Sequence, residues 1–239
     1  MKNILVVNDD GINSDGLLRL VKAAKKFGEV WVVAPESQRS ATSHSITLRN
    51  YLDLHRCDFP VEGVVAYSCS GQPADCVRVG VLNVMDEKPD IVFSGINFGY
   101  NVASDLQYSG TAGAAFEAVF QGIPAIAFSE SGNGIHEATD KYLEEIIGKY
   151  IDIEHTPGKI LNVNFPGCKI EDFKGIKENV GVSTGMFYND RYIEQERFED
   201  GGMRLFVEGV FDGAAEEGTD FSAVLNGYIA VGYVNNVGC

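Results

Sequence analysis

The sequence has few basic residues and no long apolar segment. Its 239 residues include 19 Lys and Arg against 34 Asp and Glu, which gives a formal net charge of −15 at pH 7. Binding to a nucleic-acid polymer or to an anionic lipid surface relies on Lys and Arg, so we expect neither partner. The longest apolar runs, such as Val30–Ala34 and Ile91–Phe93, are far shorter than the roughly 20 residues that span a bilayer. Ile4–Val7 is too short for the apolar core of a signal peptide, so we expect no membrane contact and a cytoplasmic location.

Cysteine pairs and the common nucleotide-binding motifs are also missing. The five cysteines form no C-x-x-C pair and no Cys/His cluster with zinc spacing, and their number is odd. We therefore expect free thiols, as in a reducing compartment, at Cys57, Cys69, Cys76, Cys168 and Cys239. The glycines of residues 11–16 lack the G-x-G-x-x-G spacing, and there is no G-x-x-x-x-G-K-[ST] loop, so neither a dinucleotide site nor a P-loop is predicted.

The sequence does contain an alternation of apolar strands and amphipathic helices over residues 1–165, which predicts an α/β fold with a mostly parallel sheet. The chain is long enough for one large domain or two small ones. The predicted strands are Asn3–Asn8, Val30–Ala34, Ile46–Leu54, Val64–Cys69, Asp90–Gly95, Pro124–Phe128 and Ile160–Phe165. The predicted helices follow Ser14 as N-cap, begin at Pro73, and span Thr111–Phe120 and Thr139–Tyr150.

Residues 180–211 lose the helical periodicity and predict a polar, extended hairpin appended to this core. A short helix near Thr219–Leu225 and a strand at Tyr228–Val234 are expected to close the fold. The hairpin suits either a subunit contact or a simple surface hairpin. Tyr188 and Tyr192 within it suit either stacking on a base or contact with a neighbouring subunit.

Two adjacent carboxylates, Asp9 and Asp10, follow the first predicted strand. Ligands of open parallel sheets collect at the carboxyl ends of the strands, where Arg39, Ser40 and Asn97 are also expected. Two buried carboxylates would repel each other unless a cation lay between them, and oxygen donors suit Mg²⁺, Mn²⁺ or Ca²⁺ better than Zn²⁺. The alternative is a solvated turn at Asp9 and Asp10, with no bound metal.

A run of small residues, Ser109–Ala115, begins the helix predicted at Thr111–Phe120. Small residues at a helix start let an anion approach the free backbone N–H groups and the positive end of the helix dipole. Close packing of the helix against the sheet also requires Gly and Ala, and for this run taken alone it is the favoured explanation. Beside a metal site the run would suit a phosphoryl group.

These residues together resemble the SurE family of stationary-phase survival nucleotidases. The resemblance runs in the same order from the first strand to the last. Its motifs are Ile4–Gly11, Ala34-Pro35 with Arg39-Ser40, Gln72–Val77, Ser94–Asn101, Tyr108–Thr111, Leu161–Asn164, and Gly218–Phe221 with Asn226–Tyr228.

The resemblance implies a divalent-metal-dependent phosphatase that acts on nucleoside 5′-monophosphates, and often 3′-monophosphates, as a dimer or tetramer. It implies one nucleotidase domain over residues 1–239, with a Rossmann-like core, helices on both faces of the sheet and residues 180–211 as a protruding arm. The implied ligands of one Mg²⁺ or Mn²⁺ per subunit are Asp9, Asp10, Ser40 and Asn97. The implied phosphate contacts are Asn101, Ser109, Gly110 and Thr111. Asp9 and Asp10 are also the candidate catalytic residues, as general base or as direct nucleophile.

The chain departs from the family pattern at three positions. Ala41 stands where the family usually has Gly, Gln72 where Thr is common, and Ala112 where a larger residue is common. None of these changes removes an implied ligand.

The alternative function is a phospho-receiver-like or metal-binding signalling domain without hydrolase activity. Such a domain needs an acceptor aspartate at the end of a middle strand and a lysine at the end of a later one. The corresponding segments here are Ser94–Asn97 and Phe128–Glu130, and neither supplies the required residue.

The negative charge is unevenly distributed. Residues 190–220 contain ten acidic and three basic residues, a net charge of −7, whereas residues 1–56 contain eight basic and six acidic residues. The acidity of the chain is therefore compatible with a small phosphate ligand near the N-terminal motifs.

Overall fold

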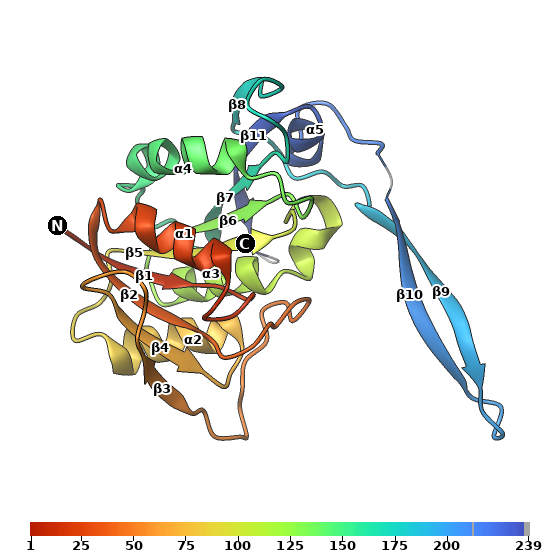
Figure 1. Cartoon of the computed structure of the whole chain (residues 1–239), viewed down its shortest axis with the longest axis horizontal. Coiled ribbons are helices and arrows are strands. Elements are labelled where there is room, and N and C mark those ends of the chain that lie inside the picture. The colour runs from red at the N-terminus through yellow and green to blue at the C-terminus, as the bar shows by residue number, and fades with distance from the viewer. Residues whose placement is uncertain (212, 237–239) are drawn as a thin grey trace.

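A computed structural model describes residues 1–211 and 213–236 and contains a nine-stranded sheet with helices on both faces (Figure 1). The strand order is β3-β4-β2-β1-β5-β6-β7-β11-β8. These strands are β1 (Lys2–Val7), β2 (Gly28–Pro35), β3 (Leu54–Cys57), β4 (Val65–Cys69), β5 (Ile91–Phe98), β6 (Ala125–Glu130), β7 (Lys159–Phe165), β8 (Gly175–Glu178) and β11 (Tyr228–Asn235). The helices are α1 (Asp15–Ala24), α2 (Pro73–Val79), α3 (Gly110–Phe120), α4 (Glu137–Tyr150) and α5 (Asp220–Leu225), with a π-helical turn η1 (Gly80–Val84) and a 3₁₀ helix η2 (Ala103–Gln107).

The central strand β1 is apolar on both faces because each face is covered by helices. Ile4 and Val6 pack with residues of α1 and α4, and Leu5 and Val7 pack with residues of α2 and α3. All four side chains are fully buried. The continuous apolar run that predicted a buried strand therefore reflects two cores, one on each side of the sheet.

Most strand pairs are parallel, as predicted. β1 pairs in parallel with both β2 and β5, and β6 continues the parallel order between β5 and β7. The two antiparallel pairs in this sheet are β3 with β4 and β11 with β7. The α/β class, the mostly parallel sheet and the helices on both faces are thus confirmed.

The predicted strand Ile46–Leu54 is wrong. Among these residues only Leu54 lies in a strand, β3, and Leu48 and Tyr51 are 81% and 96% exposed. The backbone N–H of Thr47 donates to the carboxylate of Asp75 at 3.0 Å instead of joining a ladder. The prediction also omitted the four-residue strand β8 and the helix η2, and it treated α2 and the π-helical turn as one helix.

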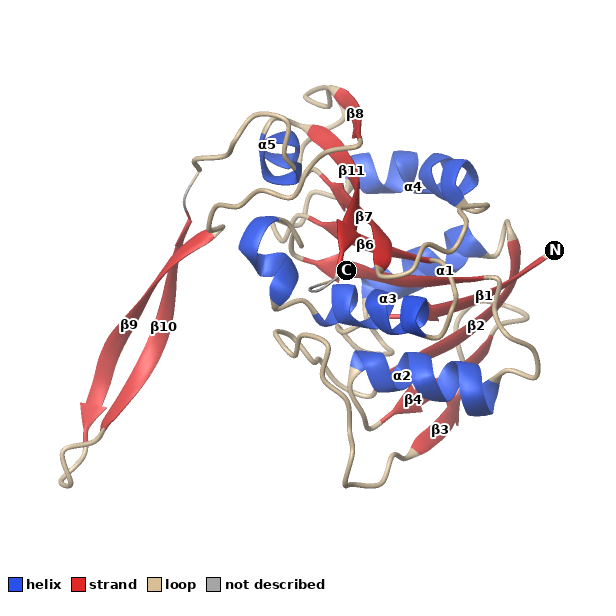
Figure 2. Cartoon of the chain, turned by 180° about the vertical axis from the view of Figure 1, so that it is seen from behind, coloured by secondary structure: helices blue, strands red, loops and turns tan. Residues whose placement is uncertain are grey.

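An arm of two antiparallel strands, β9 (Tyr188–Arg197) and β10 (Met203–Phe211), extends away from the sheet (Figures 1 and 2). Every described side chain of these strands is exposed. The base of the arm is attached to the body by Phe187, which is 6% exposed and lies with its ring centroid 4.9 Å from that of Phe221 in α5. The predicted protruding hairpin is confirmed, and its two strands occupy residues 188–211 of the predicted segment 180–211.

Two expectations from the composition can be compared with the described residues. Cys57, Cys69, Cys76 and Cys168 are free thiols, and Cys239 lies outside the described residues. Within residues 1–211 and 213–236, no helix is long and apolar enough to cross a membrane.

Candidate active site

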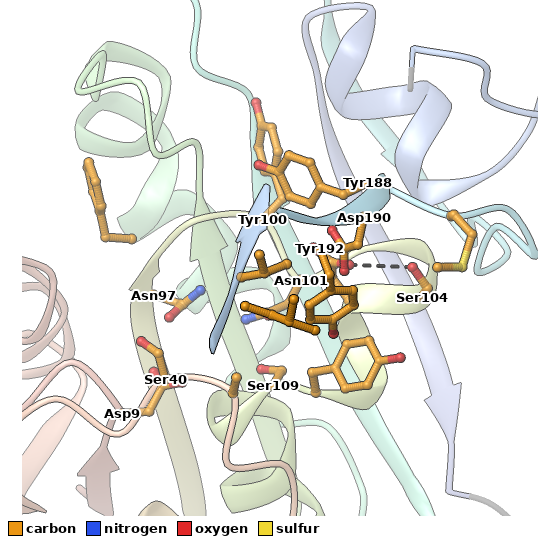
Figure 3. A pocket seen from close by; sticks show the side chains of 17 residues that line it. Asp9, Ser40, Asn97, Tyr100, Asn101, Ser104, Ser109, Tyr188, Asp190 and Tyr192 are labelled. Carbon is orange, nitrogen blue, oxygen red and sulfur yellow. Dashed lines mark hydrogen bonds between the residues drawn. The ribbon is translucent and has the colours of Figure 1, made fainter. Parts of the chain in front are cut away.

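Five of the eight predicted site residues line one pocket at the edge of the sheet where β1, β2 and β5 end. Strand order reverses at β1, since the chain moves from β1 to β2 on one side and later returns to β5 on the other. This switch point opens a crevice at the carboxyl ends of the strands. A pocket of about 670 Å³ lies there and is lined by Asp9, Ser40, Asn97, Asn101 and Ser109, among others (Figure 3).

Asp9 lies at the inner end of this pocket, two residues after the end of β1, and is 3% exposed. Its carboxylate accepts two hydrogen bonds from Thr111, one from the hydroxyl at 2.6 Å and one from the backbone N–H at 3.2 Å. Burial raises the pKa of Asp9 to about 6, the Thr111 hydroxyl opposes that shift, and the charge of Asp10 adds to it. A buried carboxylate with a raised pKa beside a second carboxylate is an arrangement that a bound cation would stabilise.

Asp10 is less buried and points to the other side of the same edge. Its carboxylate accepts the backbone N–H of Phe98 at 2.9 Å, and it lines a neighbouring pocket of about 340 Å³ together with Arg19 and Glu130. Burial raises the pKa of Asp10 as well, and the Phe98 N–H opposes that shift. In the structure, the two aspartates are therefore consecutive in the chain but line different pockets.

Ser40 and Asn97 approach Asp9 from the loop after β2 and from the end of β5 (Figure 3). The side-chain NH₂ of Asn97 donates to the carbonyl of Gly99 at 2.8 Å, which leaves its oxygen available to a ligand. Ala41, the residue after Ser40, has a φ of +56°, a left-handed conformation that Gly adopts with less strain. This conformation gives a physical reason for the glycine usual in the family at that position.

The oxygen donors around Asp9 fit a hard divalent cation. Three of the four predicted ligands, Asp9, Ser40 and Asn97, offer a carboxylate, a hydroxyl and an amide oxygen to this pocket, whose lining includes neither Cys nor His, whereas Asp10 lines the neighbouring pocket. Among residues 1–211 and 213–236, no group of three or more His, Cys, Asp and Glu side chains is placed to hold a metal.

The N-terminus of α3 faces Asp9 and is packed against it. Ser109 caps the helix, since its hydroxyl accepts the N–H of Ala112 at 3.0 Å. A Cβ on Gly110 would lie 3.0 Å from both Cβ and Oδ2 of Asp9, and one on Gly113 would lie 2.5 Å from the carbonyl of Ser43. Close packing thus accounts for these two glycines.

The anion-binding alternative for this helix start is also compatible with the geometry. The N–H groups of Ser109 and Gly110 donate to no other described residue, and Ser109 lines the pocket. Thr111 is placed differently: it is fully buried, and its hydroxyl and N–H both donate to Asp9. The structure therefore brings Ser109 to the pocket and uses Thr111 to hold Asp9.

Asn101 is held by a set of hydrogen bonds that the sequence analysis did not identify. Its N–H donates to Oδ1 of Asn164 at 2.9 Å, and its carbonyl accepts the side-chain NH₂ groups of Asn162 and Asn164. Its own side-chain NH₂ donates to Ser129 at 2.8 Å, which leaves a second N–H for a ligand in the pocket. The sequence does contain a sign of this role: Asn162 and Asn164 are polar residues two positions apart, on one face of the otherwise mostly apolar strand β7.

The base of the arm forms the outer wall of the pocket. Tyr188, Asp190 and Tyr192 of β9 line it at the end away from Asp9 (Figure 3). Asp105 of η2 lines the same pocket. Tyr188 and Tyr192, for which either base stacking or a subunit contact was expected, thus both line the pocket of their own chain. This position places both rings where they would contact a ligand in the pocket, and it leaves the outer part of the arm available for another subunit.

Comparison with known proteins places this pocket in context. A family model described as Survival protein SurE matches residues 4–187. A curated protein of Cytophaga hutchinsonii named 5′-nucleotidase SurE is 41% identical over 235 residues, which cover 95% of this chain and 88% of that protein. A protein of the same name from Thermosipho melanesiensis is 38% identical over 233 residues, which cover 96% of this chain and 89% of the relative.

A solved structure extends the similarity to three dimensions. The crystal structure of the SurE protein from Aquifex aeolicus superposes with a TM-score of 0.81 at 37% sequence identity. The superposition covers 98% of this chain and 93% of that chain. The similarity therefore includes the arm and the strands that carry the pocket.

Proposed function

The chain belongs to the SurE family of survival proteins, and from this premise we propose that it is a 5′-nucleotidase that depends on a divalent metal. The proposed reaction is hydrolysis of nucleoside 5′-monophosphates, and also of 3′-monophosphates, to nucleoside and phosphate. The observation that carries the proposal is the buried carboxylate of Asp9, which shares one pocket with oxygen donors from other strands and with the start of α3. Relatives named 5′-nucleotidase support the nucleotide as substrate.

We assign one Mg²⁺ or Mn²⁺ per subunit to Asp9, Asp10, Ser40 and Asn97. When bound, the cation supplies Lewis-acid polarisation of the phosphoryl group and a more acidic water. Thr111 holds the Asp9 carboxylate in one orientation through two hydrogen bonds. Phe98 does the same for Asp10 through its backbone N–H.

The phosphoryl group would be held between the proposed metal position and α3. Three N–H groups would donate hydrogen bonds to the phosphoryl oxygens that gain negative charge during the reaction. They are the backbone N–H groups of Ser109 and Gly110 and the second side-chain N–H of Asn101. Thr111, expected to contact phosphate, would act instead through Asp9. Of the two aspartates, Asp9 lies nearer these donors, so we assign it the role of general base or nucleophile.

We further propose that residues 1–239 act as one nucleotidase unit that assembles as a homodimer or homotetramer, with the arm among its contacts. The exposed apolar side chains of β9 and β10 support such a contact. The free thiols of the described cysteines support a reducing compartment such as the cytoplasm.

The test is phosphate release from AMP by EDTA-treated protein, with and without added Mg²⁺ or Mn²⁺. We expect metal to restore activity, and we expect Asp9→Asn and Asp10→Asn each to lose it by about 10²–10³-fold or more. Asp86→Asn, which removes an exposed acid outside the pocket, is the matched control and should retain activity. Metal-independent phosphate release, or near wild-type turnover by both site variants, would contradict the proposal.

A further inference from the structure

One face of the arm is directed at the candidate active site. Side chains of a strand alternate between its two faces, and Tyr188, Asp190 and Tyr192 share the face that lines the pocket. Their partners on β10 are Phe211, Gly209 and Val207. A Cβ on Gly209 would lie 3.2 Å from Cδ1 of Tyr188 and at contact distance, 3.4 Å, from Oδ1 of Asp190, so Gly209 packs beside both side chains.

The base of the arm is fixed relative to η2, which carries a second carboxylate of the pocket. The N–H of Phe187 donates to the hydroxyl of Ser104 at 3.3 Å, and that hydroxyl lies 3.4 Å from Oδ1 of Asp105 (Figure 3). Both Asp105 and Asp190 act on Tyr188, whose pKa is raised by burial first and then by these two charges. Asp105, Tyr188 and Asp190 all line the same pocket.

No cationic side chain balances these carboxylates within the pocket. Among the described residues that line it there is no Lys, Arg or His, and the charged groups are Asp9, Asp105 and Asp190. Asp9 and Asp10 alone would balance one divalent cation at the inner end, so each phosphoryl group that a ligand brings adds uncompensated negative charge to the pocket. Any further negative charge on the ligand would lie in the pocket without a positive partner.

Resting on the proposed function, we infer that Asp105 and Asp190 determine the charge selectivity of this pocket: they accept hydrogen bonds from the nucleoside and disfavour any ligand with more than one phosphoryl group. The hydroxyl and N–H groups of a nucleoside are donors that a carboxylate can accept without a charge penalty. When the terminal phosphoryl group of ADP occupies the inner end, its second phosphoryl group is directed toward the outer wall. The two carboxylates then repel it.

The experiment compares phosphate release from AMP and from ADP at a fixed concentration of free Mn²⁺, in the wild type, Asp190→Asn and Asp105→Asn. We expect each substitution to raise the ratio of kcat/KM for ADP to that for AMP by about three- to tenfold, the size expected from removing one charge in a partly solvated pocket. Raising the salt concentration should reduce the difference in this kcat/KM ratio between the wild type and the variants, because salt screens the charges of Asp105 and Asp190. A structural defect would lower both rates without this dependence on salt.

Glu208→Gln is the matched control, because Glu208 is an exposed acid of the arm next to Val207 and on the opposite face of β10. An unchanged ratio in both Asp variants, with AMP still hydrolysed, would overturn the inference. An equal rise in Glu208→Gln would also overturn it, because the effect would then come from overall charge. If the wild type releases no phosphate from AMP, the proposed function fails. The ratio of calorimetric Kd values for ADP and AMP in the wild type and Asp190→Asn then decides the inference alone.

Discussion

The two ends of the pocket differ in how their side chains are held. At the inner end, Asp9, Asn101 and Thr111 are 5% exposed or less, and their polar groups are tied to one another and to neighbouring strands. At the outer end, Tyr192 is 68% exposed and belongs to a two-stranded arm with no second layer of its own. Two-stranded ribbons are marginally stable alone, so this wall depends on its attachment at Phe187.

This difference separates two requirements of the proposed enzyme. Hydrolysis of a phosphate ester needs donors and ligands fixed to within a fraction of an ångström, which buried hydrogen-bonded groups on strand ends provide. Discrimination among nucleotides needs charged and aromatic side chains at the outer end. Exposed strands can carry such side chains, and these can be substituted at little cost in stability. Substitutions at the inner end should therefore affect activity and stability together. Substitutions on the arm should leave the core stable.

The largest effect is expected at the inner end, from Asn164→Ala. This change removes both hydrogen bonds that Asn164 makes to the backbone of Asn101 and leaves the buried N–H of Asn101 unpaired, while the carbonyl keeps its bond from Asn162. We expect a loss of about 1–3 kcal/mol in the free energy of unfolding and a fall in kcat/KM of tenfold or more. Urea unfolding and the AMP assay measure the two quantities.

Asn133→Ala is the control for that substitution. Its side chain also donates to a carbonyl, that of Gly167, at 2.8 Å, but at an exposed position. We expect the free energy of unfolding of Asn133→Ala to change by less than about 0.5 kcal/mol and kcat/KM for AMP to stay at the wild-type value. Equal effects in the two variants would show that the buried hydrogen bonds to Asn101 have no special role.

A graded effect on stability, with no substitution in the chain, is expected from pH. Because the folded pKa of Asp9 is raised from 3.8 to about 6, the metal-free folded state binds more protons than the unfolded state between these values. The free energy of unfolding should therefore fall as pH rises from about 4 to 6, by up to about 3 kcal/mol from this group. Apparent Mn²⁺ affinity should fall below pH 6, since a proton competes for the carboxylate.

Comparison with Asp9→Asn isolates this contribution from that of other carboxylates. The stability of the EDTA-treated variant relative to the wild type should increase over the same pH range. A difference that stays constant from pH 4 to 7 would mean that the burial of Asp9 has no energetic consequence.

The smallest effect on folding is expected on the arm, from Phe206→Ser. Phe206 is 64% exposed and lies opposite Ile193 on the face of the arm that is directed away from the pocket. We expect the free energy of unfolding to change by less than about 0.5 kcal/mol, while oligomers become weaker because the exposed apolar contact is lost. Light scattering across a concentration series measures the assembly. A loss above about 2 kcal/mol with unchanged assembly would contradict the proposed division between the two regions.

The strands that position the residues of the inner end were predictable from the sequence. A strand buried on both faces consists of a continuous run of apolar residues, which is easy to recognise. The run before Asp9 is apolar without interruption, and the residues at its carboxyl end follow from the topology of parallel sheets. The roles of Asn162, Asn164 and Thr111 were not predictable, because they depend on side-chain contacts between segments more than 60 residues apart in the sequence.

The segment Ile46–Leu54 shows where the pattern of apolar residues misleads. Ile46, Leu48 and Leu52 alternate as in a strand, yet the buried carboxylate of Asp75 binds the backbone at Thr47 and keeps this segment out of the sheet. A long-range polar contact thus overrides the local preference. The arm is a similar case. The sequence predicted that it exists, but its position in the wall of the pocket depends on long-range contacts and was not predicted.

The most direct test of the two-ended pocket is a crystal structure of the protein with Mn²⁺ and a non-hydrolysable AMP analogue, with the metal located from its anomalous signal. The account predicts one Mn²⁺ peak among Asp9, Asp10, Ser40 and Asn97, with the phosphate at the start of α3 and the nucleoside against Asp105 and Asp190. A Mn²⁺ peak away from Asp9, or a nucleoside bound elsewhere with the arm unoccupied, would contradict it.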